Sequence, residues 1–288
     1  MIATKSESAL WTTDQITEAY NTKYKFYNLA DDNIAFKIAF NYIIKNFKVQ
    51  MKYNEFIDFV NRRKSDAEVY NFLRQRYTSD TNKAVEDHDE IYKSKHIVNK
   101  VKTLYDSVSK YGPFNRILDI GTEDHIFLDK VGEKFNIKMD EDNYVKGLNI
   151  IDGYPHYSLY EEAVKSGKVI LYDGINIPFT SAIFDMVILI SVLHHVENIE
   201  EFLTKVCKIT KSIYIKDNDM STTQALCNRD IQHELYEGIL CPSVSRSSLT
   251  KITNGQILGI LRKNGFNVLV NDVSIEFTRP MVIFAQKK

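Results

Sequence analysis

The sequence predicts an α/β protein built on an open, mostly parallel sheet. Three short apolar runs, Arg116–Gly121, Gly167–Gly174 and Ile183–His195, each end on polar residues or glycine. A continuous apolar run bounded by turn residues is typical of a parallel strand that is buried on both faces. Because the carboxyl ends of such strands meet at one edge of a sheet, their polar ends predict a ligand crevice there.

Composition indicates an ordinary globular protein. The chain has 288 residues, of which 44% are hydrophobic and 26% charged, and its net charge of −1 gives no overall attraction to nucleic acid or membranes. Cys207, Cys227 and Cys241 are odd in number and lack CxxC spacing, which predicts free thiols in a reducing compartment. We find no signal-peptide pattern and no apolar run near the roughly 20 residues that span a bilayer, so we expect a cytoplasmic protein.

The first 85 residues are predicted to form a separate helical region, and 86–288 the domain that holds the sheet. Between Lys37 and Lys83 basic residues outnumber acidic ones and alternate with tyrosines. Such a surface could contact phosphates and stack bases of RNA. The alternative is a solvated helix face whose aromatic residues pack inward.

The segment 86–112 is predicted to start with an acidic turn and to continue as a helix. Adjacent Asp87, His88 and Asp89 suggest a metal site, but three consecutive helical residues do not converge on one ion. Acidic residues at a helix start, favoured by the helix dipole, are the alternative, and we predict no metal. Gly112 and Pro113 then end the helix before the first strand.

The first three strands end on residues that suit a ligand. Asp119 and Gly121 follow the first apolar run, where the tight turn needs a glycine and the aspartate could instead order the loop. Asn149 lies at the end of the second strand, 144–150, and its amide can accept one hydroxyl bond and donate another. Asp173 ends the third strand, where the alternative is a turn cap.

The fourth strand is expected to run from Asp185 to His194 and His195. Alternation along a strand lets only one of these histidines face the crevice, and His194 is our candidate, as a base or an orienting group, against a satisfied structural histidine. The next strand, 212–215, ends in Lys216. This lysine is expected in the crevice beside Asp217 and Asp219, and the alternative is a salt bridge to one of them.

The carboxyl part is predicted to return to the sheet. A helix over 256–262 is followed by Gly265 as a stop signal. Two strands, 266–274 and 281–286, follow, with a turn at 278–280, and Pro280 suits the start of a strand.

The order of these motifs resembles the class I S-adenosylmethionine (SAM) dependent methyltransferases, with type-11-like motifs. The resemblance rests on Ile117–Gly121, Gly147–Ile150, Asp173 before Ile177–Phe179, Phe184–Asp185 and Leu193–His195, in that order and at family-like spacing. It implies a Rossmann-like seven-stranded, mostly parallel sheet with a C-terminal antiparallel hairpin, and SAM as the cofactor.

The resemblance also implies roles for individual residues. Asp119 is similar to the family's acid near the methionine moiety, and Asn149 stands where the family has an acid that binds the ribose. The family usually has more glycines after Gly121, so this chain departs from the pattern there. The implied cofactor-binding residues are Asp119, Gly121, Asn149, Asp173, Gly174 and Ser191, with His194 and Lys216 as catalytic residues on the acceptor side.

The implied activity is methyl transfer to a small molecule or to RNA, including a cap ribose. Lys216 and Glu276 agree with the Lys-Asp-Lys-Glu type of ribose methyltransferase, but Ser191 and His194 stand where that type has an acid. Lys216–Asp219 with Asp230–Tyr236 resembles a pair of segments in some viral methyltransferases. The alternative function, favoured by the missing glycines and Asn149, is a catalytically inactive binding or regulatory subunit.

Overall fold

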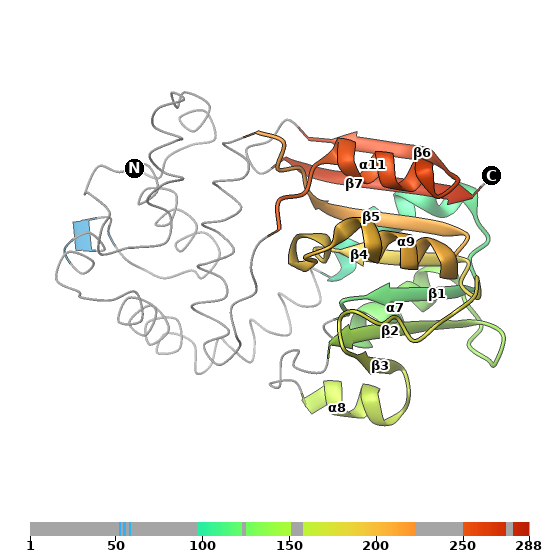
Figure 1. Ribbon diagram of the computed structural model, residues 1–288. Coiled ribbons are helices and arrows are strands. Elements are labelled where there is room, and N and C mark those ends of the chain that lie inside the picture. The colour runs from blue at the N-terminus through green and yellow to red at the C-terminus, as the bar shows by residue number, and fades with distance from the viewer. Residues whose placement is uncertain are drawn as a thin grey trace. The chain divides into compact units, whose positions relative to one another are not determined.

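The computed structural model describes 97–122, 125–150, 158–222, 250–274 and 279–287, together with four isolated positions between 52 and 58 (Figure 1). The chain divides into two compact units. One comprises 1–90, 219–249 and 275–279, and the other comprises 91–218, 250–274 and 280–288. Apart from these four positions, the predicted N-terminal helical region, its boundary near residue 85 and the acidic turn at 86–90 lie outside the described residues.

The second unit contains a seven-stranded sheet in the order β3-β2-β1-β4-β5-β7-β6 (Figure 1). β1 to β5 run parallel to their neighbours, whereas β7 is antiparallel to both β5 and β6. This arrangement confirms the predicted mostly parallel sheet and its C-terminal hairpin. The strands are β1 (Arg116–Ile120), β2 (Tyr144–Ile150), β3 (Val169–Tyr172), β4 (Met186–Ile190), β5 (Ser212–Asn218), β6 (Phe266–Val273) and β7 (Pro280–Lys287).

Helices follow the strands along the chain, and their ends are set by local signals. Asn198 accepts a hydrogen bond from the Glu201 N–H at the start of α9, and Thr253 accepts one from the Gln256 N–H at the start of α11. Gly265 has φ +82° just after α11, as expected of a stop signal. The described helices are a segment over 97–108, η2 (Ser109–Tyr111), α7 (His125–Phe135), α8 (Ser158–Lys165), η3 (Leu193–His195), α9 (Ile199–Ile209) and α11 (Asn254–Lys263).

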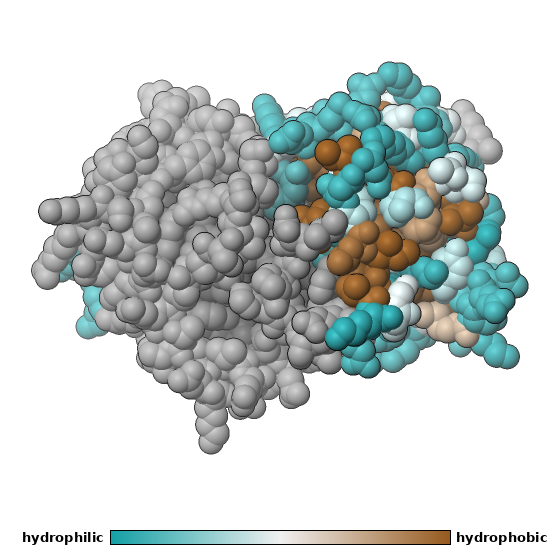
Figure 2. All heavy atoms as spheres, turned by 60° about the horizontal axis from the view of Figure 1, so that its bottom comes forward, coloured by the Kyte–Doolittle hydropathy of each residue, from teal (hydrophilic) through white to brown (hydrophobic). Residues whose placement is uncertain are grey.

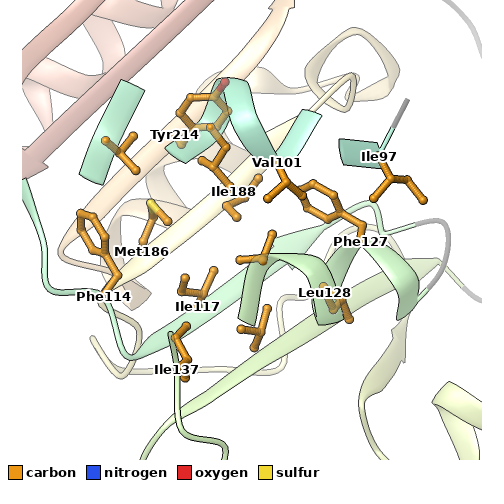
Figure 3. Close-up of a cluster of buried hydrophobic side chains, with 14 of the residues drawn as sticks. Ile97, Val101, Phe114, Ile117, Phe127, Leu128, Ile137, Met186, Ile188 and Tyr214 are labelled. Carbon is orange, nitrogen blue, oxygen red and sulfur yellow. The ribbon is translucent and has the colours of Figure 1, made fainter. Parts of the chain in front are cut away.

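One face of the sheet packs against the helix over 97–108 and against α7. Figure 3 shows Val101 of the first helix and Phe127 of α7 in the same buried cluster as Ile117, Ile188 and Tyr214 of the strands. Side chains alternate between the two faces of a strand, so the residues two positions after Ile117, Ile188 and Tyr214 lie on this same face. Asp119, Ile190 and Lys216 therefore lie on this helix-covered face, at or near the carboxyl ends of β1, β4 and β5.

The remaining large helices contribute a second layer. α9 and α11 contact each other, and α11 also contacts β6. Cys207 of α9 is a buried free thiol, and burial raises its pKa to about 12. Among the helices that the structure describes, none is long and apolar enough to cross a membrane.

Candidate functional site

A small pocket lies at the carboxyl ends of β1 and β4, on the helix-covered face. The strand register places Asp119 opposite Gly147 of β2 and Ile190 opposite Lys216 of β5. The pocket has a volume of about 40 Å³, which holds only a small part of a nucleoside-sized ligand. It is lined by Ile97, Lys100, Asp119, Gly121, Thr122, Phe127 and Ile190.

Gly121 forms the tight turn that the sequence predicts after β1. Its φ is +80°, which disfavours any residue with a side chain, and an added Cβ would lie 2.5 Å from Cγ2 of Val192. Its N–H donates a 2.8 Å hydrogen bond to the Leu148 carbonyl of β2. The loop after β1 is thereby fixed between β2 and the segment after β4.

The loop also packs directly on β2 through Thr122 and Gly147, a contact that the sequence analysis did not predict. Thr122 is buried, and a Cβ added to Gly147 would lie 2.3 Å from its Cγ2. No real Cβ approaches that closely, so only glycine fits at this position of β2. Close packing between loop and sheet is achieved here by a glycine in the strand.

Asp119 is buried and lines the pocket. Asn149, near the end of β2, is also buried, and its Oδ1 accepts a 3.0 Å hydrogen bond from the Ile150 N–H. Among the described residues, none accepts a hydrogen bond from Nδ2 of Asn149. The N–H groups of Nδ2 therefore lie at the sheet edge as hydrogen-bond donors that suit a hydroxyl group of a ligand.

Asp173 closes the turn after β3 with its own carboxylate. Oδ1 accepts hydrogen bonds from the N–H groups of Ile175 (2.8 Å) and Asn176 (2.6 Å), and Oδ2 accepts one from Nδ2 of Asn176 (2.6 Å). These bonds, led by the Asn176 N–H, hold the pKa of Asp173 below its usual value. The geometry agrees with the turn-cap alternative, and Oδ2 keeps room for a further donor.

Exposed apolar side chains lie near the ends of β2 and β3. Ile150, Leu171 and Ile175 are 45%, 37% and 64% exposed. Figure 2, in which the β3 edge comes forward, shows apolar side chains among the polar surface of the described residues. Phe179, at the end of the motif that follows Asp173, packs edge-on against buried Phe184, with ring centroids 4.9 Å apart.

The histidines do not end a strand, contrary to the sequence prediction. β4 ends at Ile190, and Ser191 turns the chain with φ +57° while its N–H donates to the Lys216 carbonyl at 2.8 Å. His194 and His195 follow in the short helix η3. The alternation argument therefore does not apply to them, although one ring is indeed buried and the other exposed.

His194 is paired with Asp217 inside the protein. Its Nδ1 lies 2.8 Å from Oδ1 of Asp217, and both side chains are only 1% exposed. Oδ2 of Asp217 also accepts a 3.1 Å hydrogen bond from the Leu193 N–H. The buried ring and its bond to Asp217 orient the segment after β4, which is one of the two roles expected of His194.

Lys216 lies on the opposite side of β5 from Asp217. Burial, and then the positive charge of Lys100, lower the pKa of Lys216. Within the described part of the chain no carboxylate forms an ion pair with it, because the pairs of Asp217 and Asp219 are with His194 and Arg279. The alternative of a salt bridge from Lys216 to one of these aspartates is therefore not formed among the described residues.

Other predicted features cannot be placed. Glu276 and the segment 230–236, on which the Lys-Asp-Lys-Glu and viral comparisons partly rest, lie outside the described residues. The same holds for Asp87, His88 and Asp89. Lys100, by contrast, was not singled out by the sequence, because a lysine in an amphipathic helix carries no signal of what it faces.

Comparison with known proteins gives one family match. Residues 151–212 match the family described as a methyltransferase domain. A search of curated proteins by sequence finds no match.

Solved structures with a similar arrangement include three methyltransferases. The CurJ carbon methyltransferase is 18% identical, with 66% of this chain and 53% of that chain covered and a TM-score of 0.44. This chain thus spans about half of the CurJ chain. Magnesium protoporphyrin IX methyltransferase from Synechocystis PCC 6803 with bound SAH is 13% identical (71% and 88% covered, TM-score 0.43). A SAM-dependent methyltransferase from Methanosarcina mazei is 16% identical (64% and 97%, TM-score 0.43). At such low identities and scores, none of these likenesses indicates what this chain acts on.

Proposed function

We propose, from the premise that this chain carries a class I SAM-dependent methyltransferase domain, that it transfers a methyl group to an acceptor bound beside Ile190 and Lys216. The observation that carries the proposal is the placement of Asp119, Asn149 and Asp173. These residues lie at the carboxyl ends of three adjacent parallel strands, β1, β2 and β3. Ligands of open α/β sheets bind along that edge.

The residues present fit the cofactor. Gly121 and Gly147 let the loop after β1 pack tightly where a Cβ would clash, and Nδ2 of Asn149 offers a donor to a ribose hydroxyl. Ile150 and Ile175 expose apolar surface for a purine, and Oδ2 of Asp173 is an acceptor for its amino group. SAM supplies an activated methyl group on a sulfonium, so the protein needs to bind, align and exclude water.

The roles on the acceptor side follow from burial. The side chain of Lys216 lies on the same face of the sheet as the pocket and contacts the acceptor directly. His194 instead holds the segment after β4 in place through its hydrogen bond to Asp217. Ser191 is the first residue of that segment and borders the cofactor. We therefore assign Lys216 to the acceptor and His194 to positioning.

A small-molecule acceptor is favoured over RNA. Among the residues that the structure describes, the cationic groups near the pocket, Lys100 and Lys216, are half-buried side chains and not an exposed basic surface. An RNA acceptor, including a cap ribose, depends on the basic N-terminal segment and on Glu276, which the structure does not describe. It remains the second candidate acceptor.

The proposal is tested by methyl transfer from radiolabelled SAM. The full chain is offered a cell extract of small molecules, capped RNA and uncapped RNA. Labelling of a small-molecule fraction, reduced in Asn149→Ala at limiting SAM, is the expected result. Labelling of RNA alone would show that the acceptor is RNA and not a small molecule. Binding of S-adenosylhomocysteine without any transfer favours the inactive binding subunit.

A further inference from the structure

Two lysines from different elements lie close together at the pocket, one of them in its lining and the other beside it. Lys100 lines the pocket from the helix over 97–108, and Lys216 ends the row of β5 residues that faces this helix. The register pairs Lys216 with Ile190, which also lines the pocket. Both lysines are half-buried, so their ammonium groups are only partly hydrated.

The two positive charges lie close enough together to interact. Lys100 lies close enough to Lys216 for its charge to lower the pKa of Lys216, in addition to the effect of burial. Within the described residues neither lysine has a hydrogen bond or an ion pair, although Asp119 lines the same pocket. Two like charges brought together in a poorly hydrated place destabilise the protein unless an anion joins them.

We propose that Lys100 and Lys216 together bind a compact anionic group, a carboxylate or phosphate, of the methyl acceptor. This inference rests on the proposed function, because it places the acceptor beside the cofactor edge of the sheet. Two ammonium groups from different elements can each donate to one anion, as single lysines commonly do to phosphates. The acceptor class is therefore a small acid or phosphate ester.

The site is tested by reactivity of the two amines in the full chain. Each lysine's rate of acetylation by acetic anhydride is followed by mass spectrometry, with inorganic phosphate or malonate compared against sodium chloride at equal ionic strength. We expect at least one anion to slow acetylation of Lys100 and Lys216 about fivefold or more, because a bound anion keeps the amines protonated and shielded. Lys102, on the same helix but exposed and paired with Asp106, is the internal control and should not change.

Two variants distinguish a specific anion-binding site from general ionic screening of the lysine charges. In Lys100→Met the protection of Lys216 should disappear, while Lys102→Met should leave it intact. Unfolding midpoints near the wild-type value show that both variants fold. Equal rates for Lys216 in both anions and in chloride would overturn the proposal, as would full protection in Lys100→Met.

The carboxylate of the cofactor is the other source of such an anion. S-adenosylhomocysteine carries that carboxylate and 5′-methylthioadenosine does not, so the two are compared as protecting ligands. If S-adenosylhomocysteine abolishes any further protection by phosphate and 5′-methylthioadenosine does not, the lysines hold the cofactor and the acceptor assignment falls. If neither nucleoside binds while phosphate still protects, the anion site stands and the proposed function fails.

Discussion

Asp217 and His194 form a buried hydrogen-bonded pair, with Oδ1 and Nδ1 2.8 Å apart, that joins β5 to the segment after β4. An ionised carboxylate only accepts hydrogen bonds, so Nδ1 carries the shared proton. The same carboxylate accepts the Leu193 N–H. One side chain therefore satisfies two buried donors and fixes the entry to η3.

Replacement of Asp217 by alanine should destabilise the fold. The change leaves His194 and the Leu193 N–H without this acceptor in a buried place, which costs on the order of 3 kcal/mol. The free energy of unfolding is measured by urea titration. Asp106→Ala, which breaks the exposed pair with Lys102, is the control and should cost less than about 1 kcal/mol. Equal effects for the two variants would show that the buried pair contributes nothing beyond a surface pair.

Gly147→Ala should disturb the loop after β1, because the new methyl would lie 2.3 Å from Cγ2 of Thr122. We expect a loss of about 1–3 kcal/mol in unfolding free energy and weaker binding of S-adenosylhomocysteine. Thr122→Ser removes Cγ2, so the double variant should recover part of both losses. A double-mutant cycle in unfolding and in calorimetry measures this recovery, and strictly additive effects would refute the contact.

Lys216→Met should stabilise the protein at neutral pH. The pKa of Lys216 is lowered from 10.5 in the folded state, so the unfolded chain binds its proton more readily. The wild type therefore carries a penalty below the lowered pKa, and that penalty disappears as pH rises toward 10.5. Urea titrations between roughly pH 7 and pH 10 measure the difference. We expect the advantage of Lys216→Met to shrink with rising pH, whereas Lys102→Met shows no such trend; a constant difference contradicts the account.

Asp173→Asn separates the two roles of this side chain. The amide keeps an acceptor for the turn N–H groups but loses Oδ2, the carboxylate oxygen that accepts from Nδ2 of Asn176. We expect a folded protein that binds S-adenosylhomocysteine roughly tenfold more weakly. S-inosylhomocysteine, which lacks the adenine amino group, should bind wild type and variant alike. If the variant loses equal affinity for both ligands, Asp173 is only a turn cap.

The sheet follows from local sequence because each strand is an apolar run of the right length. Ile117–Ile120 and Met186–Ile190 bury nearly every side chain, and turn residues lie at their ends. The position of each element, and the fact that it is a strand, can therefore be predicted without tertiary information. The C-terminal hairpin is likewise set by Gly265 and Pro280.

The site was less predictable because its contacts join residues far apart in the chain. Nothing local indicates that Thr122 needs a glycine at position 147, or that Lys100 faces Lys216. Alternation along β5 did contain one usable signal, since it separates Lys216 from Asp217 onto opposite faces. For His194 the apolar run before it suggested a longer strand, whereas positive φ at Ser191 ends the strand early.

Calorimetric titration of the full chain with S-adenosylhomocysteine tests the central claim most directly, because that claim is a cofactor site at the carboxyl ends of β1, β2 and β3. The account predicts one-to-one binding with a micromolar Kd, weakened about tenfold in Asn149→Ala, where the ribose donor is lost. The exposed substitution Lys102→Met should leave the Kd unchanged. Absence of binding by the folded wild type, or an unchanged Kd in Asn149→Ala, would contradict the account.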